Sequence, residues 1–269
     1  MYDLFDNINL HTHTYHCRHA DGEVQDYCNK LTPATAQILG FADHAPYPDE
    51  RYHWSRMFYD EMDSYCREIR QAEKEYPELK IFAGLEAEWC PDMGRDFYLN
   101  EYLGRFQLDY LIGSVHYSAF EPEIEHLFCY YDTNHVQIRR GFADNAIAAI
   151  ESGVFLFLGH PDAYTYGIFD IDSDIEKEFA DIIAAAKQYQ MPLEINAKGF
   201  RSESGYPCRR FWEMVKDAGL PVVVSADAHA PEELYDEATE QSVELANDLA
   251  LNICTGELVE RLLKNRCRI

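Results

Sequence analysis

The sequence predicts an α/β fold: a distorted, TIM-like (β/α)7 barrel with a metal site at the carboxyl ends of its seven strands. Short β-type runs alternate with segments of helical periodicity, and runs such as VFLFLG and PVVVSA are apolar enough for strands buried on both faces. No Gly/Ser/Pro-rich stretch, low-complexity run or fixed-period repeat interrupts the alternation, so we expect one domain over residues 1–269. An open, doubly wound sheet would show the same alternation.

Seven strands are expected in chain order, and apolar residues at every third or fourth position indicate helices between them. The expected strands are residues 5–10, 36–42, 80–85, 108–115, 154–159, 192–196 and 221–226. The clearest helical series are Phe58, Met62, Tyr65, Ile69, Ala72 and Tyr76, and Ile175, Phe179, Ile182, Ile183 and Ala186. Each series predicts a helix that connects two parallel strands.

Composition and charge exclude several classes of protein. The 269 residues are 47% hydrophobic, enough for a large core, yet no stretch approaches the ~18–20 unbroken apolar residues of a membrane span. The 48 acidic and 23 basic residues give a formal charge of −25. Such a charge repels nucleic acids and anionic membranes, so neither is an expected partner. The sequence leaves the oligomeric state open.

The N-terminal segment and the cysteines indicate a reducing compartment. MYDLFDNINL lacks the basic and apolar regions of a signal peptide, so we expect a cytoplasmic protein. Eight cysteines are scattered without a Cys-x-x-Cys pair, which fits neither a disulfide framework nor a zinc ribbon. We interpret them as mostly buried free thiols.

Potential metal ligands follow six of the seven expected strands. In chain order they are His11 and His13, then Asp43 and His44, Glu86, His116, His160, and finally Asp227 and His229. The carboxyl ends of barrel strands converge on one mouth, so these side chains are predicted to form one site. Alternate residues of an extended chain share a face, which lets the residues of the first pair, and likewise of the last, chelate together.

Each of these residues alone also has an ordinary structural interpretation. A single histidine is commonly hydrogen-bonded to the backbone, Glu86 could favour a helix N-terminus, and Asp227 could be an N-cap. Their recurrence after nearly every strand favours a metal centre. Imidazoles and carboxylates without thiolates suit Zn²⁺, Mn²⁺ or Fe²⁺ and do not choose among them. Because one catalytic zinc normally takes three protein ligands, eight or nine ligands indicate two or three ions.

Short motifs occur in a fixed order along nearly the whole chain. They are His11-Thr12-His13, His19, FADHAP at 41–46, GLE at 84–86, GSVHY at 113–117, GHPD at 159–162 and SADAH at 225–229. Together they resemble the polymerase and histidinol phosphatase (PHP) family. The HAP after the second strand and the stretch EINAKGFRSESGYPCRRF are most similar to the histidinol-phosphatase branch.

The resemblance implies a trinuclear metal site in a distorted seven-stranded barrel. Its ligands would be His11, His13, Glu86 and Asp227 for the first ion, Glu86, His116 and His160 for the second, and His19, His44 and His229 for the third. Glu88 lies in the same GLEAE segment, and its spacing alone would also suit a ligand. The family motif favours Glu86, because it places the glutamate directly after Gly-x.

The resemblance also implies an enzyme, a metal-dependent phosphoesterase acting on a small organic phosphomonoester, with L-histidinol phosphate as the leading candidate. A water that bridges two cations has a pKa lowered to roughly 7, and the resulting hydroxide can attack phosphorus in line. Asp227, as a ligand, and Arg201 are the expected catalytic residues. Arg201 resembles a phosphate-clamping arginine of the branch, and Lys198 and Arg18 are further candidates for binding the phosphate.

Two loops depart from the pattern of the histidinol-phosphatase branch. Residues 164–166 read Tyr-Thr-Tyr where the branch usually carries a basic residue, so a phosphate contact is missing there. The loop after His116 carries Glu121, Glu123 and Glu125, which would face either a cationic amine or solvent.

Three other functions are compatible with parts of the pattern. A phosphodiesterase or cyclic-phosphate hydrolase would use the same metal site. An amidohydrolase also begins with His-x-His, but those barrels have eight strands, and many binuclear members carry a lysine at strand four, where this chain has His116. A catalytically silent metal-binding module would require lost ligands or a fused partner, and the sequence shows neither.

Overall fold

Eight parallel strands form one sheet, each paired with the next along the chain. The computed structural model describes residues 8–31, 38–117 and 136–254, together with Gly256, Arg261 and Lys264. The strands are β1 (Ile8–Asn9), β2 (Ile38–Phe41), β3 (Lys80–Glu88), β4 (Tyr110–Ser114), β5 (Phe157–Leu158), β6 (Leu193–Asn196), β7 (Pro221–Ser225) and β8 (Asn252–Ile253).

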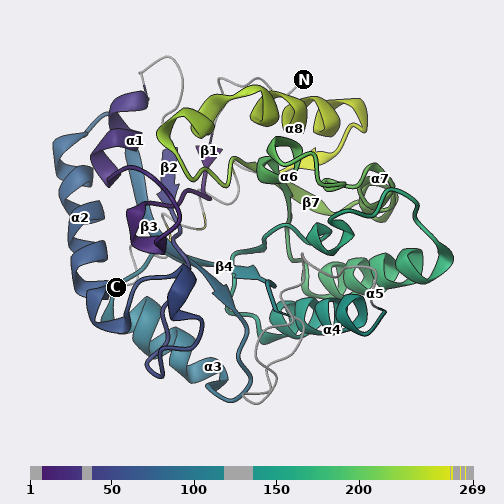
Figure 1. Ribbon diagram of the computed structural model, residues 1–269, viewed down its shortest axis with the longest axis horizontal. Coiled ribbons are helices and arrows are strands. Elements are labelled where there is room, and N and C mark those ends of the chain that lie inside the picture. Colours follow the sequence, from purple (N-terminus) through teal and green to yellow (C-terminus); the bar gives the residue numbers. More distant parts are fainter. Residues whose placement is uncertain are drawn as a thin grey trace.

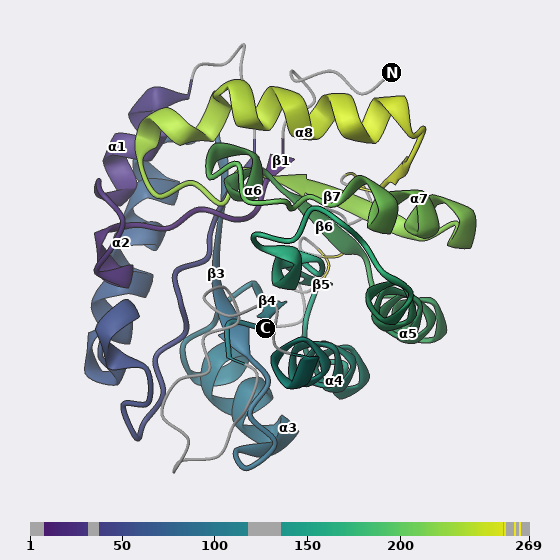
Figure 2. The ribbon, with the colours of Figure 1, turned by 45° about the vertical axis from the view of Figure 1, so that its right-hand side comes forward.

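Helices surround this sheet, because parallel neighbours require connections that return the chain outside it (Figure 1). The α-helices are α1 (Val24–Lys30), α2 (Met62–Glu75), α3 (Gly94–Phe97), α4 (Val136–Ser152), α5 (Ser173–Tyr189), α6 (Ala197–Arg201), α7 (Arg209–Ala218) and α8 (Glu237–Asp248). The 3-10 helices are η2 (Tyr15–Cys17), η3 (His53–Ser55), η4 (Tyr59–Glu61), η6 (Ala163–Thr165) and η7 (Pro231–Tyr235), and η5 (Tyr98–Arg105) is a π-helix. Figure 2 shows α1 and α2 on one side of the strands and α4 and α5 on the other.

The expected count of seven strands was wrong, because the structure has eight. The additional strand, β8, pairs with the first two residues of β7, and two residues are too few for a sequence pattern to reveal. Beyond the other end of β7, an isolated bridge joins Ala228 to Thr12, and the His13 N–H donates to the Ala228 carbonyl (2.8 Å). The sheet is thus an incomplete barrel whose first and seventh strands meet at their carboxyl ends. Residues 5–7 and 36–37 of the first two expected strands lie outside the described residues.

Both helices indicated by apolar spacing are present, although Phe58 and Tyr76 of the first series lie outside α2. α2 buries Met62, Tyr65, Ile69 and Ala72, and α5 buries the complete apolar series predicted for it. α5 begins after Asp172, whose carboxylate accepts hydrogen bonds from two N–H groups of the first turn. No helix among the described residues is long and apolar enough to cross a membrane.

The described cysteines have the state expected from their scattered positions. Cys17, Cys28, Cys66, Cys90, Cys208 and Cys254 are free thiols, and all but one of these six are buried. Cys129 and Cys267 lie outside the described residues.

The Tyr110 side chain of β4 is 3% exposed and packs inside the incomplete barrel, in a core cluster with Leu10 and Phe82. Its hydroxyl donates hydrogen bonds to the carbonyls of Leu10 and Phe41, so it ties three strand segments together. A Cβ atom added at Gly84 would lie 2.5 Å from Tyr110 Cζ, and one at Gly40 would overlap the Tyr110 hydroxyl. Both glycines are therefore required by the close approach of this ring.

We predict that Gly84→Ala lowers the free energy of unfolding by about 1–3 kcal/mol, the usual cost of overpacking a dense core. Urea denaturation at a fixed metal concentration measures the change. In a Tyr110→Ala background the added methyl group has space, so the same substitution should cost much less. Equal costs in the two backgrounds would contradict the proposed packing.

Candidate metal centre

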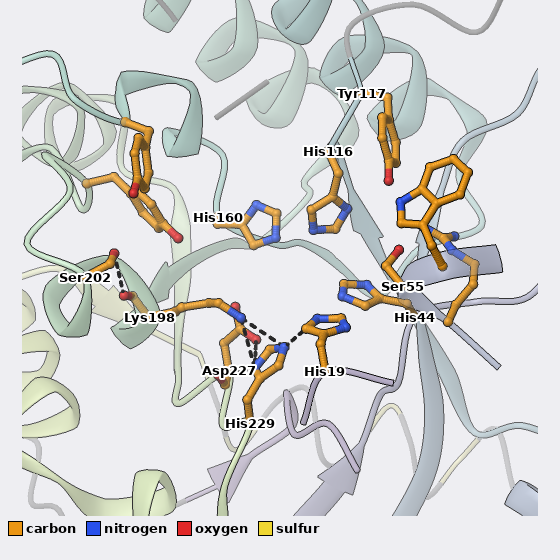
Figure 3. Close-up of a pocket in the computed structure, with 14 residues that line it drawn as sticks. His19, His44, Ser55, His116, Tyr117, His160, Lys198, Ser202, Asp227 and His229 are labelled. Carbon is orange, nitrogen blue, oxygen red and sulfur yellow. Dashed lines mark hydrogen bonds and ion pairs between the residues drawn. The ribbon is translucent and has the colours of Figure 1, made fainter. Parts of the chain in front are cut away.

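The carboxyl ends of the strands open into a cavity of about 870 Å³. In Figure 3 the labelled side chains come from strand ends and from the loops and short helices that follow them, and they surround a common space. The cavity is lined by His19, His44, Trp54, Ser55, Arg56, His116, Tyr117, His160, Tyr166, Lys198, Ser202, Tyr206, Asp227 and His229.

Glu86 lies in the middle of the expected ligands and is 2% exposed. Five imidazoles surround its carboxylate. The nitrogen-to-oxygen distances are 2.8 Å for His44 Nδ1 and His160 Nε2, and 3.4 Å for Nε2 of His11, His13 and His116. Ser114 of β4 also donates a hydrogen bond to Glu86 (2.6 Å).

Asp227 forms the second point of convergence. Its Oδ1 lies 3.1 Å from His13 Nε2 and 3.7 Å from His11 Nε2. The His229 ring stacks on that of His13 with centroids 4.2 Å apart, and His229 Nε2 lies 3.2 Å from His19 Nε2. The structure therefore brings all nine expected ligand residues together at one end of the sheet.

Several buried atoms in this cluster have no hydrogen-bond partner among the described residues. They are His11 Nε2, His13 Nδ1 and Nε2, His44 Nδ1, Glu86 Oε2 and Asp227 Oδ1. Some of these atoms lie close together, as His44 Nδ1 and Glu86 Oε2 do at 2.8 Å, but their geometry is not that of a hydrogen bond. A buried polar atom without a partner costs about 1–3 kcal/mol and is rare in native proteins. These nitrogen and oxygen atoms are of the kind that bind divalent cations, so the residues fit a metal centre.

Cys17 lies next to the histidine cluster, a position that the sequence did not predict. Its sulfur lies within 4.8 Å of potential ligand atoms of His19 and His229. Burial, with a further contribution from Asp43, raises the pKa of the Cys17 thiol well above its usual range. A neutral thiol is a poor metal ligand, which agrees with the expected set of imidazoles and carboxylates.

Two buried glutamates orient the imidazoles from behind. Glu194 of β6 accepts a hydrogen bond from His11 Nδ1 (2.8 Å) and another from the His160 backbone N–H (3.0 Å). Glu88, the other candidate ligand of the GLEAE segment, accepts a hydrogen bond from His116 Nδ1 (2.6 Å). The opposite ring nitrogen of His116, Nε2, faces Glu86. Such contacts fix the imidazole orientation and increase its basicity. Sequence reasoning missed Glu194 because it lies within a strand. The available signal is that Glu194 and Asn196, two polar residues at alternate positions of β6, share one face of the strand.

Charge and burial divide the imidazoles into two groups. Burial alone would lower the pKa of His11, but Glu194, Asp227 and Glu86 raise it well above its ordinary value. Burial also opposes protonation of His160, but contact with Glu86 raises its pKa. In contrast, burial and the charge of His13 lower the pKa of His19 to about 4.

Burial lowers the pKa of His13, His44 and His229 as well. The pKa values of the carboxylates at the centre shift in the direction opposite to that of isolated buried acids. Burial would raise the pKa values of Glu86 and Asp227, but the surrounding positive charges lower both well below the usual range. The site thus favours ionised carboxylates at its centre.

Of the three expected phosphate-binding residues, the structure brings Lys198 into the cavity. Its Nζ lies 2.9 Å from His229 Nε2 (Figure 3). Arg201 is not among the lining residues; it pairs with Asp236 and donates to the Ala226 carbonyl (2.7 Å). Arg18 is likewise outside the lining and donates to Glu61 (3.1 Å).

The two departing loops have different outcomes. Tyr164 is buried against aromatic side chains, and Tyr166 lines the cavity. The loop with Glu121, Glu123 and Glu125 lies outside the described residues. Arg56, a lining residue, was missed by sequence reasoning because it belongs to no motif and lies well beyond the end of β2.

An incomplete parallel barrel with His, Asp and Glu side chains gathered at its carboxyl ends defines a class of metal-dependent hydrolases. The family model described as "PHP domain" matches residues 9–198. A protein from Deinococcus radiodurans named "probable histidinol-phosphatase" is 30% identical over 233 residues, which cover 83% of this chain and 86% of the relative. The chain belongs to the PHP family.

Two further comparisons agree with this assignment. A "probable phosphatase" from Thermoanaerobacter sp. (strain X514) is 25% identical over 270 residues, covering 97% of this chain and 96% of the relative. The crystal structure of histidinol phosphate phosphatase from Lactococcus lactis, complexed with zinc, L-histidinol and phosphate, matches with a TM-score of 0.73 and 17% identity over 92% of this chain and 95% of that one. At this identity the structural match shows the fold. The expected enzyme class is confirmed: the chain is a histidinol-phosphatase-like phosphoesterase, and its His, Asp and Glu cluster fits the binding of divalent metal ions.

We predict that Glu194→Gln weakens zinc affinity by about 10- to 100-fold at pH 7.5, because an amide holds the His11 imidazole less firmly than a carboxylate does. Competition with a chromophoric chelator measures the dissociation constant. Glu178→Gln is the matched control, since Glu178 is also buried (4% exposed) but lies on α5 and outside the cavity lining. Equal affinities for the wild type and Glu194→Gln would argue against a supporting role.

We also predict that zinc affinity falls as pH decreases, starting above pH 6.5, the ordinary imidazole pKa. A metal binds the neutral imidazole, and nearby carboxylates raise the pKa values of His11 and His160, so protons compete at these two positions first. His19, with a pKa of about 4, stays neutral throughout. Zinc dissociation constants between pH 5 and pH 8 test this, and an affinity constant over that range would contradict it.

Proposed function

We propose that this chain hydrolyses a small organic phosphomonoester, L-histidinol phosphate, to the alcohol and inorganic phosphate. The observation that carries the proposal is the convergence of nine potential ligands, several with unpartnered buried atoms, beside one cavity that six of them line. Its volume of about 870 Å³ is in the range of small-molecule sites. The relative from Deinococcus radiodurans, by its name, supports the choice of substrate.

We propose that two or three divalent ions occupy the centre. His11, His13 and Asp227 would hold one with Glu86, which would share a second with His116 and His160; His19, His44 and His229 would hold a third. Ligand atoms lie within 4.8 Å of one another in three groups, which are His11, His13 and Asp227; His44, Glu86 and His116; and His13, His44 and His229. The first group belongs entirely to the first proposed set. The second and third groups each contain two members of the second and third sets, respectively. When bound, such ions neutralise phosphoryl oxygens and lower the pKa of water.

The side chains around the centre have separate proposed tasks. Lys198 is available on the cavity wall to donate a hydrogen bond to a phosphate oxygen. Arg201 acts as a positioning residue, because its guanidinium donates to the carbonyls of Ala226 and Asp227 (2.7 and 3.4 Å) and so holds the strand end that carries Asp227. The aromatic rings of Tyr117 and Tyr206 help to exclude water from the bound substrate.

We expect zinc- or manganese-loaded protein to release phosphate from L-histidinol phosphate with a kcat/KM above about 10⁴ M⁻¹s⁻¹, and more slowly from other phosphomonoesters. A panel that includes p-nitrophenyl phosphate and its bis ester measures the preference. Faster turnover of the diester would favour a phosphodiesterase instead. Weak, indiscriminate turnover would leave phosphoesterase chemistry in place but exclude histidinol phosphate.

Asp227→Asn should lose both bound metal and at least about 100-fold in kcat/KM, since the amide is a weak ligand and carries no charge. Metal content is measured by elemental analysis on the same sample. Asp217→Asn is the control, because Asp217 is an exposed residue of α7. Full activity and metal content in Asp227→Asn would contradict the proposed centre.

A further inference from the structure

Arg56 is a buried cation on the cavity wall with no anionic partner in the part of the chain that the structure describes. Its side chain is 2% exposed, and no ion pair joins it to any residue in the described ranges. Nη1 donates to the Ala45 carbonyl (2.8 Å), whereas Nε has no hydrogen-bond partner among these residues. A guanidinium carries five N–H donors and a permanent charge, so most of its binding capacity is unused.

The surrounding protein holds this guanidinium in place through uncharged contacts. Its central carbon lies 5.0 Å from the ring centre of Tyr52 and 5.5 Å from that of Tyr47. Tyr52 in turn stacks on the lining residue Tyr117, with centroids 4.1 Å apart and planes 6° apart. The hydrogen bond to Ala45 fixes Arg56 to the residue next to His44. Arg56 is therefore rigidly placed beside the proposed metal ligands.

Glu88 does not serve as the counter-ion of Arg56. Its charge acts on the guanidinium from a distance, but its oxygens accept hydrogen bonds from the ring and backbone nitrogens of His116. An uncompensated buried charge is costly, and cavities that contain one commonly receive an ion of the opposite sign. An anion bound in the cavity would therefore supply the counter-charge for Arg56.

Few basic side chains are in a position to bind an anion in the cavity. Arg201 and Arg18 contact protein acceptors outside the lining, and residues 164–166 supply no basic side chain. Among the described lining residues, the Lys and Arg side chains are Lys198 and Arg56. Of these, only the guanidinium presents a planar fork that matches two oxygens of a phosphate group.

We infer that Arg56 binds the phosphate group of the substrate and of the inorganic phosphate product. The choice of phosphate as the anion rests on the proposed function. Arg56 supplies, from the loop after β2, the contact that residues 164–166 lack after β5. It is a substrate-binding residue, and its effect is expected on phosphate affinity and KM.

The test is the binding of inorganic phosphate to zinc-loaded protein, measured by isothermal titration calorimetry. Arg56→Gln should weaken binding by about 10- to 100-fold, the typical effect of losing a charge-assisted, two-point contact. Arg56→Lys keeps the charge without the fork and should fall between the wild type and Arg56→Gln. Arg51→Gln is the matched control, since Arg51 lies in the same loop and pairs with Asp49 and Asp92 outside the cavity lining.

Zinc content and thermal unfolding are measured for each variant, so that loss of metal or of fold is not mistaken for loss of phosphate. If Arg56→Gln does not fold, the comparison of Arg56→Lys with the wild type decides. Unchanged phosphate affinity in the folded, zinc-loaded variant would overturn the inference, as would an equal loss in Arg51→Gln. Phosphate binding requires no turnover, so an inactive wild type that still binds phosphate through Arg56 would contradict only the proposed function.

Discussion

The arrangement of the site depends on one buried carboxylate, that of Glu86. An isolated carboxylate could not remain ionised in such an environment without nearby positive or hydrogen-bonding groups. β1, β2, β4 and β5 each place at least one imidazole within 3.4 Å of it, so four strand ends are held to β3 by the same negative charge. The backbone contributes too, since the Ala45 N–H donates to the Glu86 carbonyl (2.8 Å) and keeps His44 in register.

Around this carboxylate, imidazoles form an inner layer and carboxylates an outer one. Imidazoles surround Glu86, and the glutamates Glu88 and Glu194 lie behind them, each hydrogen-bonded to the outer nitrogen of a ring. A chain with a formal charge of −25 can still attract a phosphate, because the charges that act at long range and at short range differ. The overall acidity acts over long distances, whereas the cavity wall presents Lys198 and Arg56 at close range.

The strand order and the gathering of ligands could be predicted because every expected ligand except His19 follows an apolar run within three residues, so one local pattern gives both the strand and its end. β8 could not be predicted, because it is two residues long and depends on pairing with β7. The same limit applies to side chains whose partners are distant in sequence. Arg201 reaches Asp236, and Glu194 reaches His11 across more than 180 positions. Arg56 gains its place only when its loop folds against Tyr47 and Tyr52.

The bridge between Thr12 and Ala228 makes the meeting of β1 and β7 a seam between distant parts of the chain. His13 and Asp227 face each other across it, although roughly two hundred residues separate them. An ion shared by both would act as a reversible cross-link that closes a very long loop, and such a link removes much entropy from the unfolded chain. Metal supply would then govern the integrity of the barrel as well as its chemistry. A chain ending where the PHP match ends, at residue 198, would lack one side of that seam.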